Sequence, residues 1–264
     1  MNKENKMINF GKQPVSNRFL ENEEEVAPHY LLELSWNNEL GCPYIFQPWP
    51  IQEIRPQFDW ITCFEPEDHL DELCKIILNL KNHDQDITIA GYSFKDDSTL
   101  NRLHKLGYTK QWRIDPITDL SILNPLSNIE TFQSVFNKVL ANKITQRNGK
   151  ADILLVRHVV EHAYDLSEFI YSLTLLIKDN GYIIFELPDC EKAFTQGDCT
   201  TIWEEHTFYF FESSFKRCMY INNLDVVYTK SWEYPLENCM IAIVKKKDVE
   251  IKKINFSKNI EKDF

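Results

Sequence analysis

The sequence predicts an α/β fold built on a doubly wound, mostly parallel sheet. From residue 87 onward, short apolar segments alternate with amphipathic segments of helical length, which is the order of parallel strands and their crossover helices. The apolar segments lack a clean polar–apolar alternation, which indicates strands buried on both faces. Residues 1–66 do not show this alternation of apolar and amphipathic segments. They are rich in Pro and aromatic residues and are predicted to form a small irregular N-terminal lobe or lid.

Four apolar segments are predicted as the parallel strands: ITIAGY (87–92), YTKQWRIDP (108–116), ADILLVRH (151–158) and YIIFELP (182–188). Apolar residues at helical spacing predict helices at 65–84, 95–107, 128–144, 165–181 and 212–224. Asp97 or Ser98 is expected to cap the helix at 95–107, and Gly107 to end it. DVVYTKSWEY and ENCMIAIVKK are expected to close the sheet, and YLLELSW (30–36) to form a strand of the lobe.

The 264 residues allow one large α/β domain, placed at 67–248, between the lobe at 1–66 and a charged tail at 249–264. The net charge of −11 argues against a nucleic-acid partner. The densest basic run, KKKDVEIKK (245–253), is interleaved with acids and is expected to be a solvated end. No apolar run approaches the ~20 residues of a membrane span, so no membrane partner is expected.

The cysteines and the first residues predict a cytoplasmic protein. Seven Cys, an odd number without paired CxxC spacing, indicate free and mostly buried thiols in a reducing compartment. The opening residues MNKENKMINF lack the apolar stretch of a signal peptide. The sequence does not indicate an oligomeric state.

The carboxyl ends of parallel strands are where α/β sheets bind ligands. An acid that ends the second strand, after a Gly-containing first turn, is how such folds hold a ribose, and Asp115 and Gly91 have these positions. The turn GYSFKDDSTL has a single Gly and nothing like GxGxxG. This favours a nucleoside ligand without phosphate, such as S-adenosylmethionine (SAM), over NAD. The alternative is an ordinary strand-to-helix turn in which Asp115 is only a turn residue.

The segment RHVVEH (157–162) follows the third strand and carries four polar side chains. If it is helical, Arg157 pairs with Glu161 and His158 with His162, because each pair is four residues apart. Two His at this spacing can bind zinc. The sequence has no carboxylate directly after the first His and no obvious third ligand, so no metal site is predicted. The alternative is capping and ion pairing at the strand end.

The segment IWEEHTFYFF (202–211) places His206 behind two acids among aromatic residues. An imidazole with an ordinary pKa of ~6.5 is suited to take up a proton near neutral pH. A carboxylate on its far nitrogen would fix the tautomer, and Glu204, Glu205 or Glu161 are the available acids. The alternative is a structural His in an aromatic core.

Taken together, four stretches resemble the sugar-nucleotide C-methyltransferases, which methylate carbon 3 of 4-keto deoxysugars. GKQPVSNRFL resembles their G-x-Q-P-L-A-N-x-F-L, and WRIDP their acidic second-strand motif. ADILLVRHVVEHAYDL resembles A-D-x-x-x-x-R-H-x-x-E-H-x-x-D, and GYIIFELP with IWEEHTFYF resembles G-G-x-x-x-x-E-V-P followed by I-Y-H-E-H-x-x-Y-F. The stretches occur in the family's order over most of the chain.

The resemblance implies a class I methyltransferase fold, SAM as methyl donor and a small polar, sugar-like acceptor. It implies that the cofactor lies against Gly91, Tyr92, Ser93, Asp115, Pro116 and Arg157. It also implies that His206 moves a proton of the acceptor, with Glu205 and His162 in support. An inactive relative that binds a ligand or a partner is the alternative function.

The sequence departs from this family at three places. The family binds zinc through four Cys of its N-terminal lobe, whereas only Cys42 remains near that position, so no zinc is expected there. Trp203 and Glu204 replace the Tyr and the first His of the family motif, which removes a Tyr hydroxyl that could exchange a proton. The SAM turn keeps one Gly and carries the residues KDD.

Overall fold

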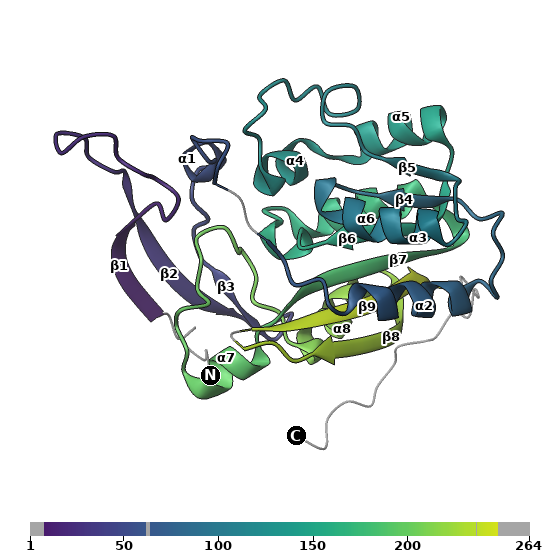
Figure 1. Ribbon diagram of the computed structural model, residues 1–264. Helices are drawn as coiled ribbons and strands as arrows, with labels where there is room; N and C mark the ends of the chain where they lie inside the picture. Colours follow the sequence, from purple (N-terminus) through teal and green to yellow (C-terminus); the bar gives the residue numbers. More distant parts are fainter. Residues whose placement is uncertain (1–7, 62–63, 236, 248–264) are drawn as a thin grey trace, which may run out of the picture.

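The computed structural model describes residues 8–61, 64–235 and 237–247. The tail predicted at 249–264 therefore lies outside the described residues. A six-stranded sheet forms the body of the molecule, and a separate three-stranded sheet lies beside one of its ends (Figure 1).

The large sheet has the order β5-β4-β6-β7-β9-β8. Its strands are β4 (Ile89–Gly91), β5 (Gln111–Arg113), β6 (Ala151–Arg157), β7 (Ile177–Asp189), β8 (Leu224–Trp232) and β9 (Asn238–Lys246). β5, β4, β6 and β7 are parallel, whereas β9 runs antiparallel to both β7 and β8. The predicted mostly parallel α/β sheet is confirmed, as is its closing pair of strands.

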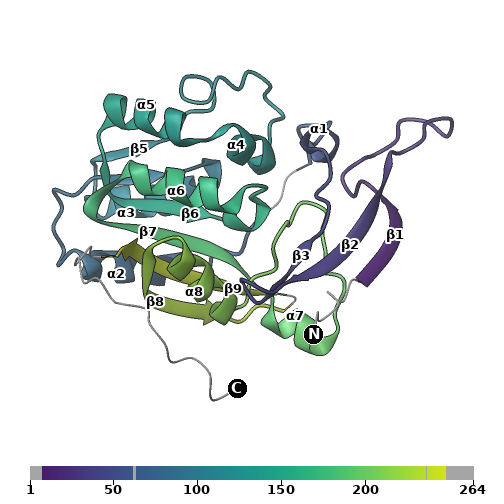
Figure 2. The same ribbon diagram turned by 180° about the vertical axis from the view of Figure 1, so that it is seen from behind.

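Helices cover both faces of this sheet because its strand residues are apolar on both sides. Ile153 and Leu155 face α2 (Leu70–Leu80) and α3 (Asp97–Lys105), which lie in front of the sheet in Figure 1. Leu154 and Val156 belong to the larger apolar core on the opposite face. That core holds α4 (Ile129–Val135), α5 (Lys138–Asn148), α6 (Leu166–Leu176) and α8 (Glu212–Ile221). Figure 2 shows this second face.

Two predicted helices differ from the prediction in their extent. The helix predicted at 128–144 is divided into α4 and α5, because the Asn137 side chain accepts hydrogen bonds from the N–H groups of Val139 and Leu140 and starts a new helix. The helix predicted at 165–181 ends at Leu176, and β7 begins at the next residue. Gly181 is a strand residue: a Cβ there would lie 3.1 Å from the carbonyl oxygen of Ala151.

The start of the helix at 95–107 differs from the prediction in its capping residue. Ser93, not Asp97 or Ser98, caps the chain, and its hydroxyl accepts from the Lys95 N–H of a 3₁₀ turn at Phe94–Asp96. The Asp96 carboxylate accepts from the Ser93 N–H in return. Gly107 follows the helix with a φ of +97°, a conformation that glycine adopts without strain, as predicted for its end.

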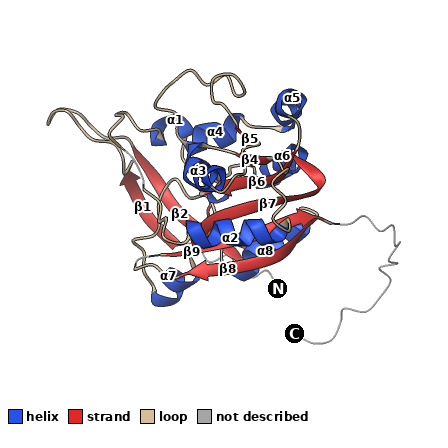
Figure 3. Cartoon of the chain, turned by 45° about the vertical axis from the view of Figure 1, so that its right-hand side comes forward, coloured by secondary structure: helices blue, strands red, loops and turns tan. Residues whose placement is uncertain are grey.

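The N-terminal lobe is a three-stranded antiparallel sheet (Figure 3). Its strands are β1 (Ile8–Pro14), β2 (His29–Asn37) and β3 (Cys42–Ile45), followed by the short helix α1 (Ile51–Ile54). β2 is the predicted strand, whereas β1 is polar and interrupted by Gly11, which hides it from the sequence pattern. The lobe core includes Cys190 and Tyr209 from the large domain, next to α7 (Glu191–Gln196). Among the described residues, no helix is long and apolar enough to cross a membrane.

Candidate functional site

Ionisable side chains gather where the carboxyl ends of β6 and β7 meet the loop at 190–211. They are connected to one another by ion pairs and ring contacts. The acids are Glu65, Glu130, Glu161 and Glu186, and the bases are Lys95, Arg157, His158, His162 and His206. Buried charges are costly unless opposite charges or hydrogen bonds compensate them. The side chains form two groups, which differ in how closely their charges are paired.

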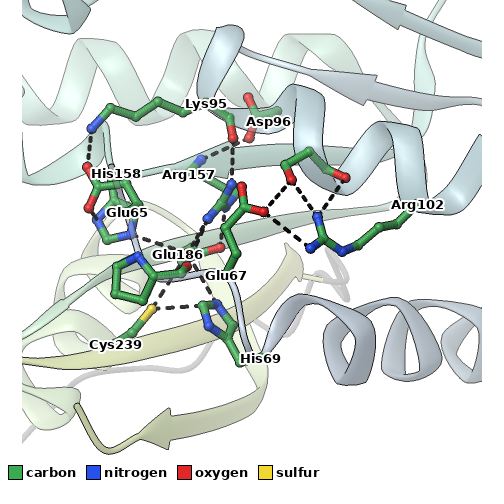
Figure 4. Close-up of polar contacts among 12 residues, drawn as sticks. Glu65, Glu67, His69, Lys95, Asp96, Arg102, Arg157, His158, Glu186 and Cys239 are labelled. Atoms are coloured by element: carbon green, nitrogen blue, oxygen red, sulfur yellow. Dashed lines mark hydrogen bonds and ion pairs between the residues drawn. The ribbon is translucent and has the colours of Figure 1, made fainter. Parts of the chain in front are cut away.

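The first group surrounds Glu186 and has its charges closely paired (Figure 4). Arg157 binds both carboxylate oxygens, through Nε at 2.5 Å and Nη2 at 2.9 Å. Its Nη1 donates to the carbonyl oxygen of Lys95 at 2.6 Å. Burial alone would raise the pKa of Glu186, but hydrogen bonds from His158, His69 and Arg157 hold that pKa well below its usual range. Glu186 is therefore a permanent buried anion.

His158 belongs to the same group and has an unusual backbone. Its φ is +47°, in the left-handed region that a side chain with a Cβ rarely adopts and that costs about 1–3 kcal/mol. Its N–H donates to the carbonyl oxygen of Glu186 at 2.7 Å. The ring points Nε2 at Glu186 (3.2 Å) and Nδ1 at Glu161 (3.4 Å) and Glu65 (3.6 Å). This backbone conformation places the His158 ring between three carboxylates.

The second group surrounds His206 and is less completely paired. The rings of His162 and His206 meet edge to face at 4.8 Å, and His162 Nδ1 lies 2.5 Å from Glu130 Oε1. His162 Nε2 faces Glu161 at 3.9 Å. Glu161 is buried, and two imidazoles approach its carboxylate: Oε1 lies 3.4 Å from His158 Nδ1 and 3.9 Å from His162 Nε2. Burial alone would raise the pKa of Glu161, but His158 and His162 lower it overall. Glu161 is therefore a buried anion whose partners are more distant than those of Glu186.

The pKa values in this group are shifted in opposite directions. Burial, together with the positive charge of His162, lowers the pKa of His206 to about 3, so its imidazole is neutral at physiological pH. Burial, together with the negative charge of Glu130, raises the pKa of Glu205 to about 7. Burial alone would lower the pKa of His162, but the ion pair with Glu130 raises it overall. Glu205 therefore exchanges its proton near neutral pH.

The two acids before His206 connect the lobe to the site. The Ser16 N–H and hydroxyl donate to Glu204 Oε1 at 2.6 and 2.8 Å. Asn17 Nδ2 donates to Glu205 at 3.3 Å and to the carbonyl oxygen of Ile54 at 2.7 Å. The stretches GKQPVSNRFL and IWEEH thus contact each other. Glu204, which stands where the C-methyltransferase motif has its first His, is bound by Ser16 of the lobe.

Gly91, Tyr92 and Ser93 form a turn that the chain fills with its own side chains. A Cβ on Gly91 would lie 2.9 Å from Leu100 Cδ1 and 3.0 Å from Asp96 Cβ. The Tyr92 ring is fully buried against Phe136, which follows α4, and Phe169 of α6. The Asp96 carboxylate accepts from the backbone N–H groups of Ser93 and Arg157. These two backbone donors are therefore already bonded within the chain.

Asp115 and Pro116 lie at a partly exposed position on the other side of this turn. Asp115 Oδ1 accepts from the N–H groups of Ile117 and Thr118 at 3.0 and 2.7 Å, and these bonds lower the pKa of its carboxyl. Its Oδ2 is suited to a ribose. Asp115 fits the predicted cofactor, whereas the closed turn at Gly91 does not fit it in this form of the protein.

The pairs predicted within RHVVEH do not form, because only Val160–His162 make a single 3₁₀ turn. Arg157 pairs with Glu186 rather than Glu161, and His162 pairs with Glu130 rather than His158. The sequence reasoning missed three members of the site: Glu65, Lys95 and Glu130. The residues KDD and an acid on the apolar face of the helix at 128–144 were the available signals.

Comparisons with known proteins agree with the fold. Residues 106–229 match the family model described as a methyltransferase domain. This match confirms the predicted fold class and the resemblance to class I SAM-dependent methyltransferases at the level of this domain, for which SAM is the cofactor. The C-methyltransferase NovU of Streptomyces niveus is 25% identical over 121 residues, which are 43% of this chain and 29% of that protein. The chain thus matches less than a third of that relative.

Solved methyltransferase structures resemble the chain more distantly. A Burkholderia thailandensis 1,6-didemethyltoxoflavin-N1-methyltransferase has 9% identity and a TM-score of 0.46, over 69% of this chain and 80% of that one. Magnesium protoporphyrin IX methyltransferase from Synechocystis PCC 6803 has 12% identity and a TM-score of 0.44, over 70% and 90%. Both were solved with bound S-adenosylhomocysteine.

Proposed function

From the methyltransferase domain at residues 106–229, we propose that this chain transfers a methyl group from SAM to a small polar, sugar-like acceptor, with His206 as general base. SAM, when bound, supplies the methyl group as an electrophile. The observation that carries the proposal is the group at His206: a neutral imidazole packed on His162, beside the Glu161 carboxylate, whose partners His158 and His162 lie 3.4 and 3.9 Å away. These groups lie at the edge of the sheet where α/β folds bind ligands.

Removal of a proton next to a keto group requires a base whose pKa lies near the operating pH. His206 is uncharged at neutral pH, but its pKa of about 3 makes it a weak base, so the bound acceptor must raise this pKa toward neutrality for His206 to act as the base. The negative charges of Glu161 and Glu65 favour the protonated form of His206, whereas burial and the charge of His162 oppose it. Glu205, with a pKa of about 7, is the residue of this group that exchanges a proton near neutrality.

The N-terminal lobe supports the exclusion of water from this reaction. Ser16 and Asn17 hold it against Glu204 and Glu205 by direct hydrogen bonds. An enolate formed beside His206 would be protected there from solvent. We place the reaction in carbohydrate biosynthesis and in the cytoplasm, where the cysteines described as free thiols remain reduced.

Exchange of solvent deuterium into a nucleotide-linked 4-keto deoxysugar tests the base without requiring SAM. The native chain is expected to exchange the proton next to the keto group, followed by NMR in D₂O. The His206→Ala variant should exchange about 10²–10⁴ times more slowly. His104→Ala, an exposed His on α3, is the control and should match the native chain. Equal exchange by His206→Ala and the native chain would remove His206 from this role.

The closed turn at Gly91 favours a second candidate, a methyltransferase-like protein without turnover that binds a ligand or partner. In that case Leu100 and Asp96 fill the cofactor position permanently. In the first case they withdraw when SAM binds. The two candidates differ in affinity for SAM, which only the first requires.

A further inference from the structure

We propose that His69, Glu186 and Cys239 form a zinc site beside the candidate active site. The three residues come from separate places: the residue before α2, strand β7 and strand β9. All three are buried, and one ligand atom of each lies within 4.8 Å of the other two. Figure 4 shows the carboxylate of Glu186, the ring of His69 and the sulfur of Cys239 directed toward one another, with His158 approaching the same carboxylate.

The distances among the three ligand atoms match the edges of a tetrahedral zinc site. Glu186 Oε1 lies 3.2 Å from His69 Nε2. Cys239 Sγ lies 3.7 Å from His69 Nε2 and 3.6 Å from Glu186 Oε1. Bonds of ~2.0–2.1 Å to nitrogen or oxygen and ~2.3 Å to sulfur give tetrahedral edges of ~3.3 Å, or ~3.6 Å where sulfur is one end.

The His69 ring has the orientation that a metal ligand needs. Its Nε2 faces the proposed ion, so Nδ1 must bind a second partner that fixes the tautomer. His69 Nδ1 lies 2.9 Å from the Tyr234 hydroxyl. His158 Nε2 lies 3.2 Å from Glu186 Oε1 and helps to position the carboxylate from outside the ligand set.

Charge and access also favour a divalent cation. An imidazole, a carboxylate and a thiolate are donors that zinc accepts, and binding would release the thiol proton of Cys239 to solvent. Arg157 binds both oxygens of Glu186, Oε2 through Nε at 2.5 Å and Oε1 through Nη2 at 2.9 Å, and so fixes the orientation of the carboxylate. His69 also borders a hollow of about 260 Å³ whose rim carries Asp68, Glu72 and Glu233. Three carboxylates at this rim attract cations.

This site is distinct from the zinc site of the family that the sequence resembles, because it uses none of the lobe cysteines. Three protein ligands leave the fourth tetrahedral position to water or another small ligand. The ion would tie the segment at 65–69 to the ends of β7 and β9. It would thereby fix Glu65 and His158, which face the group at His206.

Zinc analysis of the purified full chain tests this proposal. After dialysis against metal-free buffer, the native chain should retain one zinc per chain by mass spectrometry. Cys239→Ser and His69→Ala should lose it. Cys199→Ser and His104→Ala remove an exposed thiol and an exposed imidazole and should keep it. Zinc that Cys239→Ser retains like the native chain, or a native chain free of zinc after Zn²⁺ is added and dialysed, would overturn the site.

Cobalt spectroscopy on the native chain tests for the metal site even where a variant does not fold. Co²⁺ added to the zinc-depleted chain should give the intense visible bands of a four-coordinate ion and a near-ultraviolet thiolate-to-cobalt band. A folded Cys239→Ser variant, checked by circular dichroism, should lack the thiolate band. Absence of that band in the native chain contradicts the proposal. Turnover is not measured, so the result is independent of the proposed methyl transfer.

Discussion

The two groups at the edge of the sheet differ in how their charges are compensated. Glu186 is bound on both oxygens by Arg157 and is approached by two imidazoles. Glu161, also buried, has two imidazoles at 3.4 and 3.9 Å, and the neighbouring His206 is held neutral. The first arrangement compensates its anion more closely than the second. We therefore propose that the Glu186 group is structural and that the His206 group is the reactive one.

The largest effect is expected from breaking the Glu186 group. Glu186→Gln removes the anion that compensates the buried Arg157 and leaves that guanidinium without a charged partner. Loss of one partner of a buried ion pair costs about 3–5 kcal/mol. Urea unfolding at neutral pH measures this loss. Glu39→Gln, at an exposed position, is the control and should unfold like the native chain; equal stability of both variants would contradict the structural assignment.

A smaller loss is expected at the closed turn. Gly91→Ala places a Cβ 2.9 Å from Leu100 Cδ1 and 3.0 Å from Asp96 Cβ, and such overpacking costs about 1–3 kcal/mol. Urea unfolding again provides the measurement. Because the clash with Leu100 disappears in the Gly91→Ala/Leu100→Ala double variant, its loss should be less than the sum of the two single losses. If the losses of the two single variants add up to that of the double variant, the Cβ at residue 91 does not clash with Leu100.

The reactive group predicts a dependence of stability on pH. The pKa of Glu205 rises from its ordinary 4.5 to about 7 in the folded chain. Between these values the folded chain binds more protons than the unfolded one, so Glu205 lowers the stability as the pH rises. Glu205→Gln lacks this term and should gain on the order of 1 kcal/mol relative to the native chain between pH 4.5 and pH 8, allowing for solvent screening of a half-buried group.

Urea midpoints of both chains at these two pH values test the shift. Glu39→Gln, at an exposed position, is again the control. A constant difference between Glu205→Gln and the native chain would mean that Glu205 has an ordinary pKa.

The smallest change in stability is expected at Asp115. Asn keeps the oxygen that accepts from the N–H groups of Ile117 and Thr118, so Asp115→Asn should change the free energy of unfolding by less than ~0.5 kcal/mol. It removes the charge that a ribose would meet, so SAM affinity should fall while urea unfolding stays unchanged. A large loss of stability would show that Asp115 only holds its own turn.

The sequence pattern predicted the large sheet well because buried parallel strands are uniformly apolar. β6 and β7 have such sequences, and the comparison with the methyltransferase family agrees with the fold they predict. The break between α4 and α5 was not predicted. Asn also occurs inside helices, so the sequence alone does not show that Asn137 is the N-cap of a new helix. β1 was not predicted because its residues are polar and pair only with β2.

The site was harder to predict because its members meet only in three dimensions. His206, Glu205 and His162 were predicted together, and the structure places His206 on His162. Their partners are far away in the sequence: Glu130 lies on α4, and Lys95 lies in the turn that was expected to hold the cofactor. Ion pairs of this kind leave no periodic signal, and the filling of the Gly91 turn by Leu100 depends on the packing of α3.

Calorimetry with SAM tests the proposed function most directly. The native chain should bind SAM with measurable heat and micromolar affinity. Asp115→Ala should bind more weakly by about tenfold or more, whereas His206→Ala should stay within a few-fold of the native chain. Heat that is absent at every practical SAM concentration, in a chain that unfolds cooperatively, would contradict a SAM-dependent methyltransferase and leave the closed turn at Gly91 as the permanent state of this protein.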